Sequence, residues 1–324
     1  LINNGIHPGE PAGIDASLKF TNDLLKNETA QKRILQKSVI VIISVYNIGG
    51  HLQRSAFNRA NQTTPVETGF RGRAANLDLN RDFTKCDSEN AKSFTRIFHE
   101  WNPDVFLDTH TTNGSDHQYS ITLVGPQPDR FPPSQEKFIR KKMLPTLFSQ
   151  MKKGEYELIP YVSWMHNDPK QGIKMMQEVP RFSSGYASMF HSYGMMTENH
   201  VYKPFADRVK SCYQFIWELA EFMANNSDEI IASRKKGIRE SMQANNYPIA
   251  SEIDTTVFEE MEFKGYEVDE EQISPLTGLK RFGYDRNKPY TATIRYYTKY
   301  RTTESTKIPE YYILPLAWSE VVER

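Results

Sequence analysis

Helix-like and strand-like segments alternate along the first 240 residues, and this alternation limits the fold more than any other feature of the sequence. Ser38 to Tyr46 is nearly continuously apolar and β-branched, as expected for an inner strand of a mostly parallel sheet with helices on both faces. A helix pattern from Pro11 to Gln36 precedes it. A second helix, Asp87 to Trp101, leads into a strand at Asp104 to Thr109. The alternation predicts an α/β fold.

The alternation ends near residue 240. Helices are expected at Ser134 to Met151 and Phe205 to Ala224, with a strand at Gly194 to Glu198 between them. Later segments read as strands separated by Gly, Pro and Asn turns: Ile253 to Phe258, Lys264 to Val268, Ala292 to Tyr300 and Tyr311 to Leu316. We therefore expect a larger α/β domain of residues 1–240 and a smaller β-rich accessory domain of residues 241–324.

The charge balance excludes several partners. Lys plus Arg and Asp plus Glu both total 40, so no net field favours nucleic acid or a membrane surface. The longest apolar run, Val39 to Val45, is too short to span a bilayer. The sequence predicts a soluble protein that binds no nucleic acid and has no membrane span.

The pattern His7-x-x-Glu10 supplies an imidazole and a carboxylate three residues apart. Catalytic zinc commonly uses two His and one Glu and keeps a position for water. A short pattern of this kind recurs by chance, and most matches are surface pairs. Here a Gly-Glu-Pro turn precedes a helix, which would place both side chains at a sheet edge where α/β folds bind ligands.

His110 is the best third ligand, because it ends the apolar strand Val105 to Leu107 and precedes a polar turn at Thr111 to Gly114. The alternative is a hydrogen-bonded histidine within a strand, which needs no metal. His117 and His200 lie near the same segments and are expected to have supporting or structural roles.

Asn76 to Phe83 is the most distinctive segment. Arg81 offers a planar fork of donors that can hold a carboxylate, and Asn80 adds a neutral donor beside it. Asp78 is suited to hold the second ring nitrogen of a metal-bound histidine. On composition alone, a surface ion pair worth under about 1 kcal/mol is the simpler interpretation.

Four motifs follow one another along the chain: His7-x-x-Glu10, Asp78-Leu79-Asn80-Arg81, His110 and Thr197-Glu198. Their order and spacing resemble the zinc metallocarboxypeptidase family of carboxypeptidase A-like peptidases. The resemblance covers roughly residues 1–225 and is weaker over the C-terminal β region. It implies a mixed, mostly parallel central sheet with helices on both faces.

The resemblance also implies a metal site. One Zn²⁺ per chain would be bound by His7, Glu10 and His110, with Asp78 orienting His7. Glu198 would be the general base and acid for a zinc-activated water.

Substrate contacts follow from the same resemblance. Asn80 and Arg81 would bind the terminal carboxylate of the substrate. Arg71 would stabilise the carbonyl oxyanion, although Arg73 and Arg59 lie close enough in sequence to compete for this role.

The tyrosine that covers the substrate in the family is harder to place, and Tyr186 is the candidate. Side-chain specificity should depend on the segment from Tyr161 to Tyr186. Within this segment, aromatic and basic character is mixed by Trp164, His166, Lys170, Lys174 and Arg181.

By this resemblance the chain is a metallocarboxypeptidase whose substrate is a peptide, or a peptide-like molecule, with a free C-terminal carboxylate. A zinc-dependent deacylase of N-acylated amino acids and a peptidase that trims cell-wall peptides remain alternatives within the same scaffold. A metal-binding or carbohydrate-binding module without catalysis is a third, but it would not require a carboxylate at Glu198. We expect a secreted or periplasmic location. Only six residues precede His7, which suggests that an N-terminal part of the catalytic domain lies outside this sequence.

Overall fold

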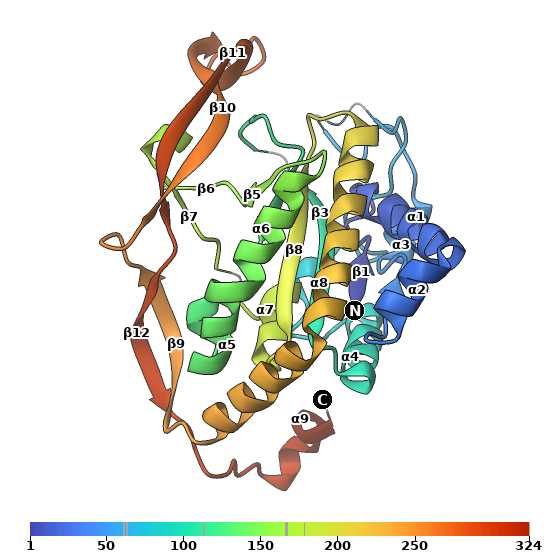
Figure 1. The fold of residues 1–324 in the computed structure, drawn as a ribbon, viewed down its shortest axis with the longest axis vertical. Helices are drawn as coiled ribbons and strands as arrows, with labels where there is room; N and C mark the ends of the chain where they lie inside the picture. The colour runs from blue at the N-terminus through green and yellow to red at the C-terminus, as the bar shows by residue number, and fades with distance from the viewer. Residues whose placement is uncertain (61, 63, 113, 166–167, 178, 324) are drawn as a thin grey trace.

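A six-stranded sheet forms the centre of the molecule (Figure 1). The computed structural model describes residues 1–60, 62, 64–112, 114–165, 168–177 and 179–323. The strands lie in the order β2, β1, β3, β8, β4, β5, and each neighbouring pair is parallel except β8 with β4. Their bounds are β1 Ile2–Asn4, β2 Ile42–Ile43, β3 Val105–Thr112, β4 Ile121–Val124, β5 Leu158–Pro160 and β8 Tyr193–His200. The predicted mixed, mostly parallel sheet is confirmed.

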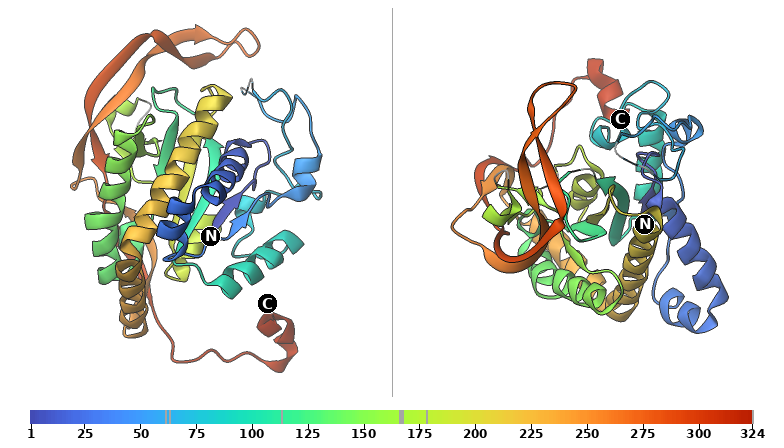
Figure 2. Two further views of the ribbon diagram at one scale, coloured as in Figure 1. Left: turned by 45° about the vertical axis from the view of Figure 1, so that its right-hand side comes forward. Right: turned by 90° about the horizontal axis from the view of Figure 1, so that it is seen from above.

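Helices cover both faces of this sheet (Figure 2). On one face lie α1 Ala12–Lys26, α2 Glu28–Leu35, α5 Pro133–Phe138, α6 Leu144–Lys153 and α8 Phe205–Met242; on the other lie α4 Glu89–Trp101 and α7 Ser183–Met189. Residues of β3 alternate between the two apolar clusters. Val105 and Leu107 join the first cluster, and Phe106 joins the second, as expected for a strand buried on both faces.

The prediction of an inner strand at Ser38 to Tyr46 is wrong. Only Ile42–Ile43 form a strand, β2, and it lies at the edge of the sheet. The run is continuously apolar because Ile40 and Ile42 pack against one apolar cluster while Val41 and Ile43 pack against the other. Contact with both helix layers therefore gave an edge strand the sequence pattern of a central one.

Two predicted helices have different bounds. The Pro11 to Gln36 helix is divided at Asn27, whose side chain accepts a hydrogen bond from the Ala30 N–H and so begins α2. Helix α8 continues to Met242, past a kink at Asn226. The added length is anchored by the buried Arg234, which donates to the Asn102 carbonyl and pairs with Asp104.

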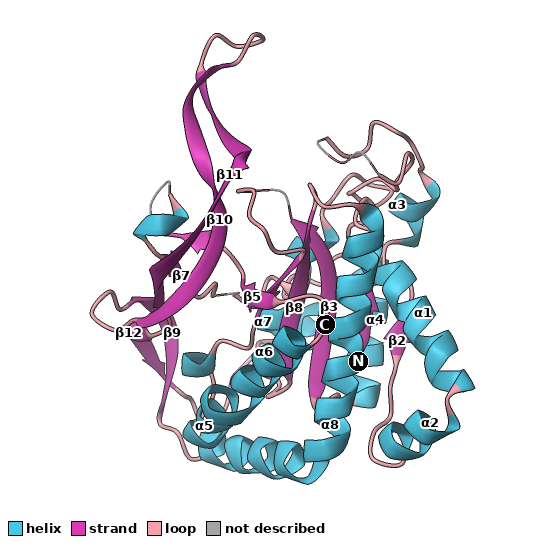
Figure 3. Ribbon diagram, turned by 45° about the horizontal axis from the view of Figure 1, so that its top comes forward, coloured by secondary structure: helices cyan, strands magenta, loops and turns pink. Residues whose placement is uncertain are grey.

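The C-terminal region is rich in β structure, as predicted. β10 Glu259–Ile273 and β11 Lys280–Tyr297 form a long antiparallel hairpin, and β9 Asn246–Ile253 pairs with β12 Tyr300–Lys307. β11 also pairs with β7 Ile173–Lys174, and β7 pairs in turn with β6 Ser163–Trp164 in antiparallel orientation. The outer half of the hairpin projects beyond the rest of the molecule (Figure 3). The expected strand at Ile253 to Phe258 is wrong, because β9 ends at Ile253 and a turn follows. The expected strand at Tyr311 to Leu316 is also wrong, because residues 311–315 form neither helix nor strand and Leu316 begins a 3₁₀ turn.

The remaining elements are short: helices α3 Ile48–Leu52 and α9 Ser319–Glu323, a π-helical turn Ile139–Met143 between α5 and α6, and 3₁₀ turns Leu79–Arg81, Pro128–Arg130, Pro169–Gln171 and Leu316–Trp318. None of the helices in the described part of the chain has the length and apolar character needed to cross a membrane. Phe263, Ile294 and Tyr296 of the hairpin belong to the larger apolar cluster. The division at residue 240 remains a prediction.

Candidate zinc and active site

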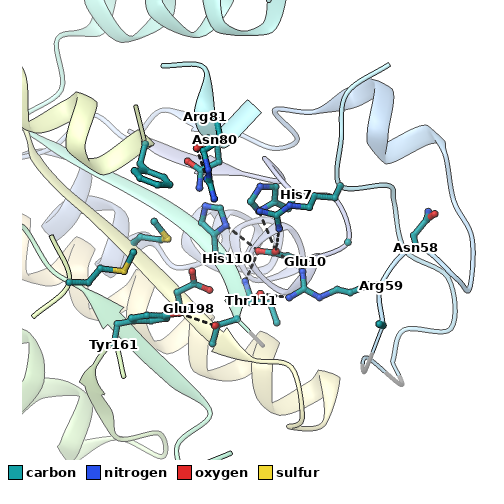
Figure 4. A pocket seen from close by; sticks show the side chains of 17 residues that line it. His7, Glu10, Asn58, Arg59, Asn80, Arg81, His110, Thr111, Tyr161 and Glu198 are labelled. Atoms are coloured by element: carbon teal, nitrogen blue, oxygen red, sulfur yellow. Dashed lines mark hydrogen bonds and ion pairs between the residues drawn. The ribbon is translucent and has the colours of Figure 1, made fainter. Parts of the chain in front are cut away.

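Three buried side chains converge at the carboxyl ends of neighbouring strands β1 and β3 (Figure 4). His7 and Glu10 lie in the turn between β1 and α1, which is closed by a 2.8 Å hydrogen bond from the Glu10 N–H to the His7 carbonyl. His110 lies on β3. One ligand atom from each of the three residues lies within 4.8 Å of the others. Parallel strands therefore bring the two parts of the predicted ligand set together, 100 residues apart in sequence.

The hydrogen bonds of the two histidines fit a metal. His7 Nε2 lies 2.9 Å from Asp78 Oδ1, and His110 Nε2 lies 3.1 Å from Asp108 Oδ2. A carboxylate at Nε2 holds the proton there and leaves Nδ1 as the electron-pair donor. Both Nδ1 atoms face Glu10, at 3.2 and 3.1 Å, and the buried His7 Nδ1 has no hydrogen-bond donor among the described residues. Two imidazole nitrogens and a carboxylate aimed at one point form a donor set for zinc.

Charges near the cluster keep its carboxylates ionised. Burial raises the pKa of Glu10, but the opposing effects of Arg59, His7 and His110 hold that pKa well below its ordinary value. Burial also raises the pKa of Asp78, but His7, Arg71 and the backbone N–H of Asn80 together hold that pKa below its ordinary value. A metal ligand must be deprotonated to bind, so Glu10 is ready to bind a cation.

Glu198 lies on β8 in register with His110 of β3 and with Thr122 of β4. Residues in register on adjacent strands point to the same face of a sheet. The half-buried Glu198 side chain accordingly lines the same cavity as the ligand set (Figure 4).

This cavity has a volume of about 440 Å³. Its walls are formed by His7, Gly9, Glu10, Asn58, Arg59, Ala60, Arg71, Asn80, Arg81, His110, Thr111, Thr112, Tyr161, Met176, Phe182, Met196 and Glu198. The volume lies within the range of ordinary small-molecule pockets, about 300 to 1,000 Å³.

The three arginines of the cavity have different partners. Arg59 lies 2.5 Å from Glu10 and also donates to the Thr111 carbonyl. Arg71 lies 2.9 Å from Asp78. Arg81 donates to the Asn80 carbonyl and lies over the Phe182 ring at 4.4 Å, and it has no carboxylate partner among the described residues. Arg81 is therefore the cavity arginine with donors left for an incoming carboxylate.

Comparison with known families agrees with this site. A family model described as zinc carboxypeptidase matches residues 1–276. The chain belongs to the zinc carboxypeptidase family. Zinc is the metal of this family, and His7, Glu10 and His110 form its site in this chain.

The individual relatives found for this chain are distant and are covered only in part. This chain is 26% identical to carboxypeptidase 2 of Trichophyton rubrum over 111 residues. The matched stretch covers 34% of this chain and 18% of that protein. A solved structure from Shewanella denitrificans OS-217, named "Putative carboxypeptidase A", gives a TM-score of 0.52 at 17% identity and covers 70% of this chain and 57% of that one. The structural likeness shows the fold alone.

The structure brings most of the predicted site residues together. The predicted zinc ligands line the cavity together with Arg71, Asn80, Arg81 and Glu198. Asp78 contacts His7 as expected. Which of these residues act in catalysis or substrate binding remains a prediction.

Tyr186 lies elsewhere. Its side chain is 7% exposed and packs among Phe83, Phe94 and Phe98, and its hydroxyl lies 3.0 Å from His99 Nε2. It does not line the cavity, so the structure lends no support to a substrate-binding role. Phe182, four residues earlier, occupies the wall instead.

Sequence reasoning missed other residues of the site. Asp108 was not considered, although it lies two residues before His110 on a strand and so faces the same way. Met196 precedes Glu198 by the same interval. Arg59 was considered only as a competitor of Arg71.

In the segment expected to govern specificity, Tyr161, Met176 and Phe182 line the cavity. Lys170 instead pairs with Glu267 at 2.7 Å, and Lys174 and Arg181 are not among the lining residues. His166 and the side chain of Trp164 lie outside the described residues.

Proposed function

We propose that this chain is a zinc-dependent metallocarboxypeptidase that hydrolyses the C-terminal peptide bond of peptides. The observation that carries the proposal is Arg81, a cavity arginine without a carboxylate partner among the described residues, in the same cavity as the zinc ligands and Glu198. Capture of a terminal carboxylate there restricts cleavage to the end of a peptide.

The side chains then have separate tasks. Bound zinc would supply a Lewis acid that lowers the pKa of water and polarises a carbonyl. Arg81 and Asn80 hold the carboxylate and so place the last peptide bond beside Glu198. Glu198 accepts a proton from the attacking water and passes it to the leaving amine. Arg71, half-exposed and 3.6 Å from Glu10, stabilises charge on the carbonyl oxygen, a role worth about a hundredfold or more in turnover.

The test measures the zinc content and the rate at which C-terminal amino acids are released from peptides, for the wild type and for Glu198→Gln. We expect one zinc per chain in both proteins. The rate of amino acid release should fall by about a hundredfold or more in the variant, because proton transfer contributes that much. Glu262→Gln makes the same chemical change at an exposed position of β10 and should leave release unchanged. Absence of zinc from the wild type, or full activity in Glu198→Gln, would contradict the proposal.

An N-acylated amino acid also ends in a carboxylate, so Arg81 would bind it equally well. The assay therefore includes N-acetyl amino acids and a cell-wall peptide beside ordinary peptides. Hydrolysis of the N-acetyl compounds alone would replace the proposed activity with deacylation. Secretion or a periplasmic location remains a prediction.

A further inference from the structure

We propose that the cavity selects C-terminal residues with apolar side chains, and that Met176, Met196, Tyr161 and Phe182 form the pocket for that side chain. This inference rests on the proposed carboxypeptidase function and names its substrate class.

Met196 forms the floor of the pocket. It precedes Glu198 by two residues on β8, so both side chains point to the same face of the sheet. Its register partners are Asp108 on β3 and Val124 on β4, and its side chain is 3% exposed. A substrate side chain that enters beside Glu198 therefore meets a thioether from the centre of the sheet.

Two further walls come from the connections after β5 and β7. Tyr161 is fixed by a 2.9 Å hydrogen bond from its N–H to the Leu123 carbonyl, and its hydroxyl lies 3.3 Å from Thr112 Oγ1. Met176 follows Met175, whose backbone is bound on both sides: its N–H donates to the Tyr297 carbonyl, and its carbonyl accepts from the Tyr300 hydroxyl, both at 2.8 Å. The C-terminal β region thus helps to place Met176.

Phe182 connects this pocket to the carboxylate site, because its ring lies under the Arg81 guanidinium at 4.4 Å. The α-carboxylate and the side chain of a terminal residue are joined by one carbon atom. A substrate held by Arg81 therefore has its terminal side chain beside Phe182 and the methionines.

The charges that line the cavity disfavour both basic and acidic terminal side chains. Among the described lining residues the only carboxylates are Glu10, which binds the metal, and Glu198, which transfers the proton. A terminal Lys or Arg would be buried without a partner of its own, which is costly. A terminal Asp or Glu fares no better, because Arg59 and Arg71 are paired with protein carboxylates and Arg81 binds the α-carboxylate. Methionine side chains adapt to different shapes, so Leu, Met and Phe should all be accepted.

The test compares kcat/KM for N-blocked dipeptides that differ only in a C-terminal Leu, Met, Phe, Lys or Glu. For the wild type we expect the three apolar residues to exceed Lys and Glu by about tenfold or more, since an unpaired buried charge costs more than 1.4 kcal/mol. Met196→Glu places a carboxylate in the pocket and should raise the Lys to Leu ratio by about tenfold or more. Met196→Leu, a change of similar volume, should keep the wild-type order.

Met176→Glu provides the same test at a partly exposed position, where an added charge does not threaten folding. A wild type that prefers Lys or Glu, or a Lys to Leu ratio unchanged in both Glu variants, would overturn the inference and leave the carboxypeptidase function standing. If the zinc-loaded protein released no C-terminal amino acid from any of the peptides, both the proposed function and this inference would be overturned.

Discussion

Each histidine of the zinc site is held by an aspartate from a different part of the chain. Asp78 binds His7 through one oxygen and Arg71 through the other. Asp108 is fully buried, binds His110, and accepts further hydrogen bonds from Asn3 and Ser183. A carboxylate at this position fixes the ring and makes the metal-binding nitrogen more basic.

Asp108→Asn should therefore weaken zinc binding by about 10- to 100-fold while the three ligands remain present. The neutral amide keeps the volume but loses the charge that supports His110. The dissociation constant can be measured by competition with a chromophoric chelator. Asp23→Asn, at a partly exposed position of α1 where the carboxylate pairs with Lys19, is the control and should bind zinc as the wild type does. Equal affinity in Asp108→Asn would show that this aspartate does not support the metal.

At this scale the sequence predicted the ligands well, because His7, Glu10 and His110 occur in turns or at strand ends with an informative order. It could not place Tyr186. Which side of α7 faces the cavity depends on packing against Phe83 and Phe98, which lie about 90 to 100 residues earlier in the chain. No local pattern within Ser183–Met189 records that rotation.

Among the elements, β8 and β10 are joined by a buried pair of histidines. His200 is the last residue of β8, and its Nε2 lies 2.7 Å from the Ser115 carbonyl. The centres of the His200 and His117 rings are 4.6 Å apart. His117 forms an isolated antiparallel β-bridge with Gly265 of β10. Burial, assisted by the charges of nearby cations, lowers the pKa of His200 to about 4. Burial also holds the pKa of His117 well below its ordinary value, so both histidines are neutral in the folded protein at neutral pH.

This pair should make the protein sensitive to acid. Between pH 6.5, the ordinary histidine pKa, and about 4, the unfolded chain binds a proton at residue 200 and the folded chain does not. The free energy of unfolding should thus fall as pH falls through this window, by on the order of 2 to 3 kcal/mol for this residue. His200→Gln should reduce that fall.

The measurement is urea unfolding of the wild type and His200→Gln at several pH values from 7 to 4, with a chelator present so that metal loss does not contribute. If His200→Gln is less stable than the wild type at pH 7, the difference between their free energies of unfolding should shrink as the pH is lowered. Only the wild type loses stability by protonation at this position. A constant difference across the window would rule out the assigned pKa.

Element boundaries were predictable where a local signal exists. Ser88 caps α4 by accepting from the Ala91 N–H, and a serine before a helical segment is a cap signal that the sequence shows directly. The length of α8 was not predictable, because its last turns depend on contacts such as that of Arg234 with Asp104, 130 residues away. The edge position of β2 likewise depends on which strand pairs with β1.

At the scale of the whole molecule, the β10–β11 hairpin shares its inner half with the main apolar core. Phe263 is 1% exposed and Ile294 is 2% exposed, and both belong to the cluster that contains α1, α6 and α8. β11 also pairs with β7, next to the segment that carries Met176. The family match continues to residue 276, across the boundary predicted at residue 240. These contacts favour one cooperative unit over two independent domains.

Phe263→Ala should then lower the free energy of unfolding of the whole chain by about 3 to 5 kcal/mol, because it leaves a cavity in a shared core. Three of the four tryptophans, at positions 101, 164 and 217, lie within residues 1–240, so their fluorescence reports on that part. In denaturant, a single transition should move to lower concentration by both fluorescence and circular dichroism. Phe258→Ala, at a side chain that is 42% exposed, should cause a much smaller shift. If Phe263→Ala left the fluorescence transition in place and moved only a second one, the β-rich region would be an independent accessory domain, because its core could then be weakened without loss of stability in residues 1–240.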